Sequence, residues 1–286
     1  MSALEEFART TSSSWPVIAK ARTDALERLT AYEAAFVGTL PPDVSLVVFG
    51  SAARLERTSK SDVDWTLLID GSVDPLHHRL VAEAANKFRE LGDAPPGREA
   101  TFGGISISHD LVHLIGGEED SNANLTRRLL LLLESAVVGD PAAYQRVLRA
   151  LLHRYISEDF GWQQGTTDNV PRFLLNDVVR YWRTVAVDFA YKRRERALEG
   201  WALRTVKLRM SRKLTFARGL LMCFNCADDP QLSAEISAHP KDGTFAITAA
   251  VGFLMDQIGI TPLDALAAAV SRHTELHAAG VKLFHA

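Results

Sequence analysis

The N-terminal part of the chain alternates between apolar patterns of helical spacing and of extended spacing. Amphipathic segments with apolar residues every three or four positions favour helices, whereas short runs of valine, leucine and isoleucine favour buried strands. Clusters of glycine, proline and aspartate separate these segments and indicate turns. In chain order, the pattern predicts a helix at residues 17–38, strands at 45–49 and 63–70, a helix at 75–91 and a strand at 105–114.

From about residue 125 onward every segment has a helical pattern, including residues 125–138. The sequence therefore predicts an α+β fold, in which a small mixed β-sheet with flanking helices is followed by an all-helical C-terminal domain. The pattern changes between residues 117 and 124. We expect a core domain with an N-terminal helix at residues 1–120 and a helical domain at residues 121–286.

The composition is that of an ordinary globular protein, with 47% hydrophobic residues, 23% charged residues and a net charge of -3. No apolar run approaches the roughly 18 residues needed to cross a membrane, so we expect no membrane partner. The first residues carry acidic side chains and lack an apolar stretch. We therefore expect no signal peptide and a cytoplasmic location.

The two cysteines, Cys223 and Cys226, stand three positions apart at the end of an apolar helical segment. A zinc site usually has four ligands, and a redox motif usually follows a strand. Neither condition is met here. We therefore expect two buried thiols with a structural role.

Positive charge is concentrated between Arg180 and Arg218, where twelve Lys or Arg residues stand against three acidic ones. Such an excess favours contact with phosphate, although a solvated helix face would have the same composition. Within this segment Arg204, Lys207 and Ser211 have the i, i+3, i+7 spacing that places side chains on one helix face. We expect these three side chains to contact the phosphates of a nucleotide.

The pattern most informative about chemistry is Gly50-Ser51, ten residues, and then Asp62-Val63-Asp64. Side chains in a strand alternate between faces, so Asp62 and Asp64 point the same way, about 6.5–7 Å apart. Two adjacent carboxylates repel each other unless a cation lies between them, and Mg²⁺ prefers such oxygen ligands. Gly50 allows the backbone to approach a phosphate, and Ser51 offers an N–H and a hydroxyl to its oxygens.

This combination resembles the signature of the DNA polymerase beta superfamily of nucleotidyltransferases, which has Gly-Ser after one strand and two acids on the next. The resemblance implies an enzyme that uses Mg²⁺ or Mn²⁺ and transfers a nucleoside monophosphate from a nucleoside triphosphate, such as ATP, to a hydroxyl group. Asp62 and Asp64 would hold the metal, and Gly50 and Ser51 would contact the phosphates. The pair Lys207 and Ser211 is similar to a nucleotide-contacting helix of several members.

The superfamily normally has a third carboxylate that orders one metal ion and helps to deprotonate the acceptor. The segment around Asp110 is similar to the third-acid strand of the bacterial glutamine-synthetase adenylyltransferases and PII-protein uridylyltransferases. That resemblance implies that Asp110 is the third metal ligand. The alternation of residues around it leaves the strand register open, and Glu99 is the alternative.

Several alternatives remain open on the sequence alone. The acceptor could be a protein side chain, a small molecule or an RNA end, and the base of the nucleotide is undetermined. A nucleotide-binding regulatory protein without catalytic activity would follow if the third acid were missing. In a further alternative, Arg272 and His277 resemble the Arg-then-His spacing of the HEPN ribonucleases, a pattern that fixes only two residues.

Overall fold

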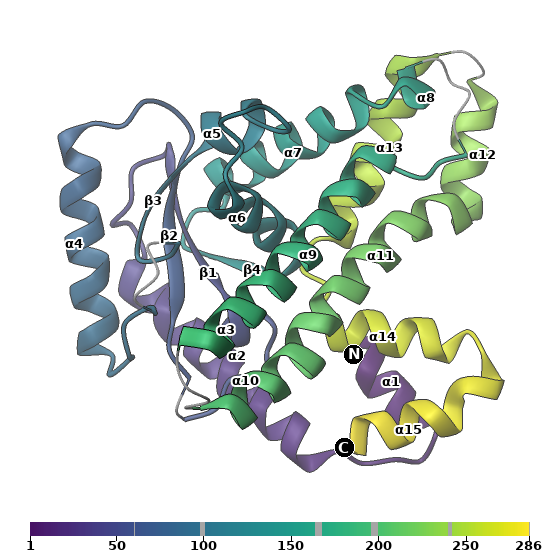
Figure 1. The fold of residues 1–286 in the computed structure, drawn as a ribbon, viewed down its shortest axis with the longest axis horizontal. Helices are drawn as coiled ribbons and strands as arrows, with labels where there is room; N and C mark the ends of the chain where they lie inside the picture. The colour runs from purple at the N-terminus through teal and green to yellow at the C-terminus, as the bar shows by residue number, and fades with distance from the viewer. Residues whose placement is uncertain (60, 98–100, 164–167, 196–199, 240–241, 286) are drawn as a thin grey trace. The chain divides into compact units, whose positions relative to one another are not determined.

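The structure is a computed structural model of the chain, drawn in Figure 1. Its contacts divide the chain into two compact units. The first unit comprises residues 1–109, 134–146 and 259–286, and the second comprises residues 110–133 and 147–258. The structure describes all residues except 60, 98–100, 164–167, 196–199, 240–241 and 286.

The first unit contains a four-stranded mixed sheet with the strand order β3-β2-β1-β4. β1 pairs antiparallel with both β2 and β4, and β2 pairs parallel with β3. All six residues of β1, including the polar Ser45, are buried, as its largely apolar run predicts for a central strand. The strands are β1 (Val44–Phe49), β2 (Asp64–Ile69), β3 (Gly104–Ile107) and β4 (Ser135–Val138).

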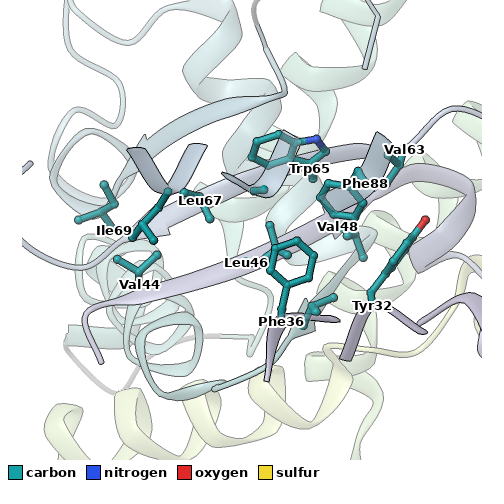
Figure 2. Close-up of a cluster of buried hydrophobic side chains, with 13 residues drawn as sticks. Tyr32, Phe36, Val44, Leu46, Val48, Val63, Trp65, Leu67, Ile69 and Phe88 are labelled. Atoms are coloured by element: carbon teal, nitrogen blue, oxygen red, sulfur yellow. The ribbon is translucent and has the colours of Figure 1, made fainter. Parts of the chain in front are cut away.

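Two helices, α2 (Pro16–Phe36) and α4 (Pro75–Glu90), supply apolar side chains to the main core of the first unit. Figure 2 shows this core, in which Phe36 and Phe88 lie among alternate residues of β1 and β2. Because strand side chains alternate, the remaining residues of β2, including Asp64, point to the opposite face of the sheet. The core residues of β1 and β2 are Val44, Leu46, Val48, Trp65, Leu67 and Ile69.

The two ends of the chain meet in a second core of the first unit. Helices α1 (Ala3–Thr10), α14 (Pro262–Ser271) and α15 (His277–His285) pack together around Phe7, Trp15 and other buried apolar residues. The carboxylate of Asp264 in α14 accepts a hydrogen bond from the Leu4 N–H at 3.1 Å and pairs with Arg22 at 3.1 Å. These bonds fix α14 to both N-terminal helices.

The second unit is helical. Its central contacts join α9, α11 and α6, and a π-helical turn, η1, links α10 to α11. Its elements are α6 (Asn122–Leu133), α7 (Ala142–Ser157, shared with the first unit), α8 (Phe160–Gln163), α9 (Arg172–Glu195), α10 (Trp201–Lys207), η1 (Leu208–Arg212), α11 (Lys213–Asp228), α12 (Pro230–Ala238) and α13 (Gly243–Gln257).

These observations confirm the predicted fold class, in which a small mixed sheet with flanking helices accompanies a helical C-terminal region. The predicted first helix, first two strands and following helix correspond to α2, β1, β2 and α4. The units are discontinuous along the chain, and the single boundary near residue 120 stays a prediction. No single helix in the described ranges has the length and apolar character needed to cross a membrane. The consecutive helices α13 and α14 reach that length and apolar character only when the two are taken together.

Two predictions about the sheet were wrong. The strand expected at 105–114 ends at Ile107, and residues Ser108–His113 form a short helix, α5, that buries Leu111 and Val112. The helix expected at 125–138 ends at Leu133, and Ser135–Val138 form β4 instead. In β4 the β-branched Val137 and Val138 pair with the free edge of β1, so tertiary pairing outweighs the helical pattern of the preceding leucines.

Candidate functional site

The two predicted metal-binding aspartates lie where the chain enters β2. Asp64 is the first residue of β2 and is half-buried, whereas Asp62 is exposed and forms an isolated parallel bridge with Ala94. Between them Val63 is 1% exposed and packs in the main core. The alternation of burial places both carboxylates on the side of the chain opposite Val63, as the sequence predicts.

Gly50 and Ser51 follow β1 and begin the four-residue helix α3 (Gly50–Ala53). Phe49 pairs with Asp64 in the β1–β2 register, so this turn begins beside the start of β2. Gly50 has φ +67°, and a β-carbon there would lie 3.4 Å from Asp64 Oδ2. The backbone of Gly50 therefore lies against the Asp64 carboxylate, in a conformation that favours glycine.

The loop after this turn is held by a half-buried arginine, Arg54, whose side chain is 12% exposed. Arg54 pairs with Glu56 at 2.9 Å and with Glu134, next to the start of β4, also at 2.9 Å. Burial opposes the charge of Arg54, but the two carboxylates outweigh it and raise the pKa of the guanidinium. Leu55, between these partners, has φ +58°, which is rare for a residue with a side chain.

Asp110, the predicted third metal ligand, lies in α5 rather than on a strand. It is half-buried and belongs to the second unit, where its backbone carbonyl accepts a hydrogen bond from Asn124 Nδ2 at 2.7 Å. Burial lowers the pKa of Arg127 in α6, and the charge of Asp110 opposes that effect. The metal role of Asp110 stays a prediction, and its alternative, Glu99, lies outside the described residues.

Among the residues that the structure describes, no three His, Cys, Asp or Glu side chains are gathered so that they could hold a metal ion. The described residues thus offer Asp62 and Asp64 as a pair of metal ligands. Mg²⁺ in nucleotide enzymes is commonly held by one or two carboxylates together with substrate phosphates and water. The pair with its adjacent Gly50 turn fits such an ion.

The predicted phosphate-contacting residues of the second unit lie on two kinds of helix. Arg204 and Lys207 are in α10, which contains no buried residue, and Ser211 is in the π-helical turn η1. Lys207 is exposed, and Arg204 and Ser211 are half-buried. The sequence did not indicate the π-helical turn, a feature that often occurs at functional sites. Contact of these residues with phosphate stays a prediction.

Two other groups of residues singled out by the sequence have packing contacts. Cys223 and Cys226 are buried free thiols, which confirms their predicted burial, and burial raises the pKa of Cys223 to about 12. The ring of His277 lies edge-on to Phe7, with centroids 5.5 Å apart, and its Nε2 is 3.4 Å from the Ser271 carbonyl. These contacts place His277 at the edge of the core where the chain ends meet.

The N-terminal part of the chain is similar to a known family. Residues 3–94 match the model of a family described as "Putative nucleotidyltransferase DUF294". This match supports a nucleotidyltransferase, and the matched segment contains Gly50, Ser51, Asp62 and Asp64 but not Asp110. Comparison with curated proteins finds no match, and comparison with solved structures finds none either.

Proposed function

We propose that this chain is a metal-dependent nucleotidyltransferase that transfers a nucleoside monophosphate from a nucleoside triphosphate to a hydroxyl acceptor. One observation carries the proposal: the Gly50 turn lies against the carboxylate of Asp64. Asp62 stands two residues before Asp64, the spacing that places two side chains on the same side of an extended chain. The match of residues 3–94 to a nucleotidyltransferase family supports it. A phosphate-binding turn beside paired carboxylates suits a nucleotide bound with its metal ion.

In this proposal Asp62 and Asp64 hold Mg²⁺ or Mn²⁺. A bound divalent ion would neutralise the negative charge that the triphosphate brings to the site. Gly50 has no side chain, so its backbone approaches the phosphates closely, and Ser51 donates its N–H and hydroxyl to their oxygens. Most of the rate enhancement then comes from positioning and from electrostatic stabilisation.

The transfer itself exchanges one phosphorus–oxygen bond for another. The acceptor oxygen forms a bond to the α-phosphorus, the bond between the α-phosphorus and its bridging oxygen to the β-phosphate breaks, and pyrophosphate leaves. Asp110 accepts the proton of the acceptor hydroxyl in this scheme. Arg204, Lys207 and Ser211 bind the β- and γ-phosphates, because a cationic helix face complements their charge.

The acceptor in this proposal is a protein side chain, a small molecule or an RNA end. The resemblance of the Asp110 segment to the adenylyl- and uridylyltransferases of nitrogen regulation supports a protein acceptor. One observation favours a second function, a nucleotide-binding regulator without catalytic activity: in the described part of the chain, no third carboxylate joins Asp62 and Asp64 as a metal ligand. A transfer assay separates these two functions.

The test is to incubate the protein with cell lysate, Mg²⁺ or Mn²⁺ and each of four α-³²P-labelled nucleoside triphosphates. The Asp62→Asn/Asp64→Asn double variant removes the paired charges with little change in size. Asp24→Asn is a matched control, because Asp24 pairs with Lys20 on the exposed face of α2.

Label on an acceptor with the wild type and the Asp24→Asn variant, but not with the double variant, is the expected result. It would also identify the nucleotide and the class of acceptor. If the protein binds nucleotides but neither transfers label nor releases pyrophosphate with any of the four, the enzymatic function is overturned. The function as a nucleotide-binding regulator then remains.

A further inference from the structure

A buried carboxylate, Asp93, lies just after α4 and binds two arginines and a tyrosine. Its side chain is fully buried. Arg57 Nη2 donates to Oδ1 at 2.8 Å, and Tyr32 donates its hydroxyl to Oδ2 at 2.9 Å. Arg28 reaches both oxygens, with Nη2 2.8 Å from Oδ2 and Nε 3.3 Å from Oδ1. Both oxygens of this carboxylate are thus hydrogen-bonded.

These partners come from two separate elements of the first unit. Arg28 and Tyr32 lie on α2, whereas Arg57 lies in the loop that runs from α3 towards Asp62. Asp93 therefore ties this loop to α2 through one carboxylate. The side chain of Arg57 is only 15% exposed, so solvent screens this ion pair much less than it screens a surface pair.

The residue after Asp93 is in direct backbone contact with the candidate metal site. Ala94 forms the parallel bridge with Asp62, and its carbonyl accepts the Val63 N–H at 3.3 Å. Asp93 in turn donates its own N–H to the Phe88 carbonyl at 3.0 Å. The chain at Asp62 is thus fixed on one side by Ala94, and on the other side its neighbour Ser61 is hydrogen-bonded to Thr58, the residue after Arg57.

We propose that Asp93 and Arg57 are positioning residues of the nucleotide site, which fix the backbone at Asp62 and thereby the place of its carboxylate for a divalent cation. This inference rests on the proposed function. Neither side chain touches the cation. Each acts on Asp62 through neighbouring residues. Asp93 acts by way of Ala94, and Arg57 acts by way of the next residue, Thr58, whose carbonyl accepts the N–H of Ser61 at 3.0 Å, next to Asp62. Groups that orient a metal ligand typically change metal affinity about 10–100-fold when they are removed.

Asp93→Asn would leave two arginines in partly buried places without a counter-charge, so this variant can fail to fold. Arg57→Gln is the sharper change, because it cuts the link to the loop and leaves Asp93 paired with Arg28 and Tyr32. Tyr32→Phe is the matched control, because it removes a bond to the same carboxylate from α2 and leaves the loop linked. Arg57→Lys keeps the charge and tests rescue.

The readout is the dissociation constant of Mn²⁺ alone, measured by electron paramagnetic resonance, beside the urea midpoint of each variant. We expect Arg57→Gln to weaken Mn²⁺ binding about tenfold, Tyr32→Phe to leave it unchanged, and Arg57→Lys to restore most of it. If Arg57→Gln does not fold, Arg57→Lys is compared with Tyr32→Phe instead. In that case we expect Arg57→Lys to weaken Mn²⁺ binding by less than about tenfold and Tyr32→Phe to leave it unchanged.

Equal Mn²⁺ affinity in the folded Arg57 variants and in Tyr32→Phe would overturn the inference, since a merely structural role lowers the urea midpoint alone. A wild type that binds no Mn²⁺ would overturn it as well. A wild type that binds Mn²⁺ but transfers no nucleotide would overturn the proposed catalysis and leave the positioning role standing.

Discussion

A β-carbon on Gly50 would lie 3.4 Å from Oδ2 of Asp64. Gly50 directly follows the last residue of β1, and Asp64 is the first residue of the neighbouring strand β2, where it pairs with Phe49. Gly50 also has φ +67°, which residues with a side chain rarely adopt. The turn therefore brings peptide backbone next to the carboxylate in a conformation that favours glycine.

Replacing Gly50 with alanine tests this relationship. The left-handed backbone costs an alanine about 1–2 kcal/mol of stability, and its methyl group would lie against Asp64. We expect Gly50→Ala to lower the kcat/KM of nucleotide transfer about 10–100-fold, because a small displacement in a site of this kind has that effect. Steady-state kinetics with the labelled nucleotide checks this expectation.

Gly38→Ala is the control, because Gly38 has φ +66° and open space around it. The two variants share the backbone strain and differ in the contact with Asp64. Similar kinetics in both would show that the contact of Gly50 with Asp64 has no role in transfer.

The buried pairs of Arg54 predict an order of stabilities. Arg54→Gln leaves the carboxylates of Glu56 and Glu134 without their shared partner, and breaking a buried ion pair costs about 3–5 kcal/mol. Glu134→Gln leaves Arg54 paired with Glu56, so we expect a smaller loss. Urea unfolding at pH 7 measures both. A larger loss for Glu134→Gln than for Arg54→Gln would show that Arg54 is not the centre of the cluster.

The central part of the sheet could be predicted from the sequence because its signals are local. β1 and β2 are short apolar runs between turn residues, and both were predicted within one residue at each end. β4 could not be predicted, because its four residues follow a run of leucines and become a strand only by pairing with β1. β3 is short for the same kind of reason, since its pairing with β2 ends at Ile107 and the chain then turns into α5.

The residues of the candidate site likewise fall into those that the sequence predicts and those that it does not. Gly50, Asp62 and Asp64 are recognisable from spacing and alternation, which neighbouring residues determine. Asp93 and Arg57 stand 36 residues apart and meet only because α2, α4 and the loop pack together. No local pattern marks an aspartate whose partners are distant in the chain, so this cluster becomes visible only in the folded structure.

Tyr32 predicts a loss of stability at alkaline pH. Burial and its hydrogen bond to Asp93 raise the pKa of Tyr32 to about 12, from an ordinary value of 10.0. A raised folded-state pKa contributes stability that is complete below the unfolded pKa and disappears as pH rises through the folded one. The contribution of Tyr32 should therefore be complete below about pH 10 and be lost between about pH 10 and 12.

Tyr32→Phe should be less stable than the wild type at pH 8, by about 1–3 kcal/mol, because Asp93 loses a buried hydrogen bond. This difference should shrink as pH rises above 10, and urea unfolding between pH 8 and 11 measures it. Tyr191→Phe is the control, because Tyr191 is 56% exposed. A difference between wild type and Tyr32→Phe that stays constant over this range would show that Tyr32 does not titrate in the way its surroundings predict.

Two helical glycines should respond in opposite ways when they are replaced with alanine. One of them, Gly280, lies where the two chain ends meet. A β-carbon on Gly280 in α15 would lie 2.7 Å from Val270 Cγ1 and 3.0 Å from Phe7 Cζ, whereas one on Gly252 in α13 would meet nothing within 4 Å. Valine is stiff at χ1 and cannot easily turn away. Gly280→Ala should therefore overpack the core between α1, α14 and α15 and cost about 1–3 kcal/mol.

Gly252→Ala should instead stabilise the protein by up to about 1 kcal/mol, since alanine favours a helix over glycine and nothing opposes its methyl group. Thermal and urea unfolding of the two variants beside the wild type measure both effects. If Gly280→Ala were as stable as Gly252→Ala, then α1 and α15 would not pack as closely as the structure has them. The N-terminal helix would then contribute little to the first unit, and removing residues 1–10 should leave the urea midpoint unchanged.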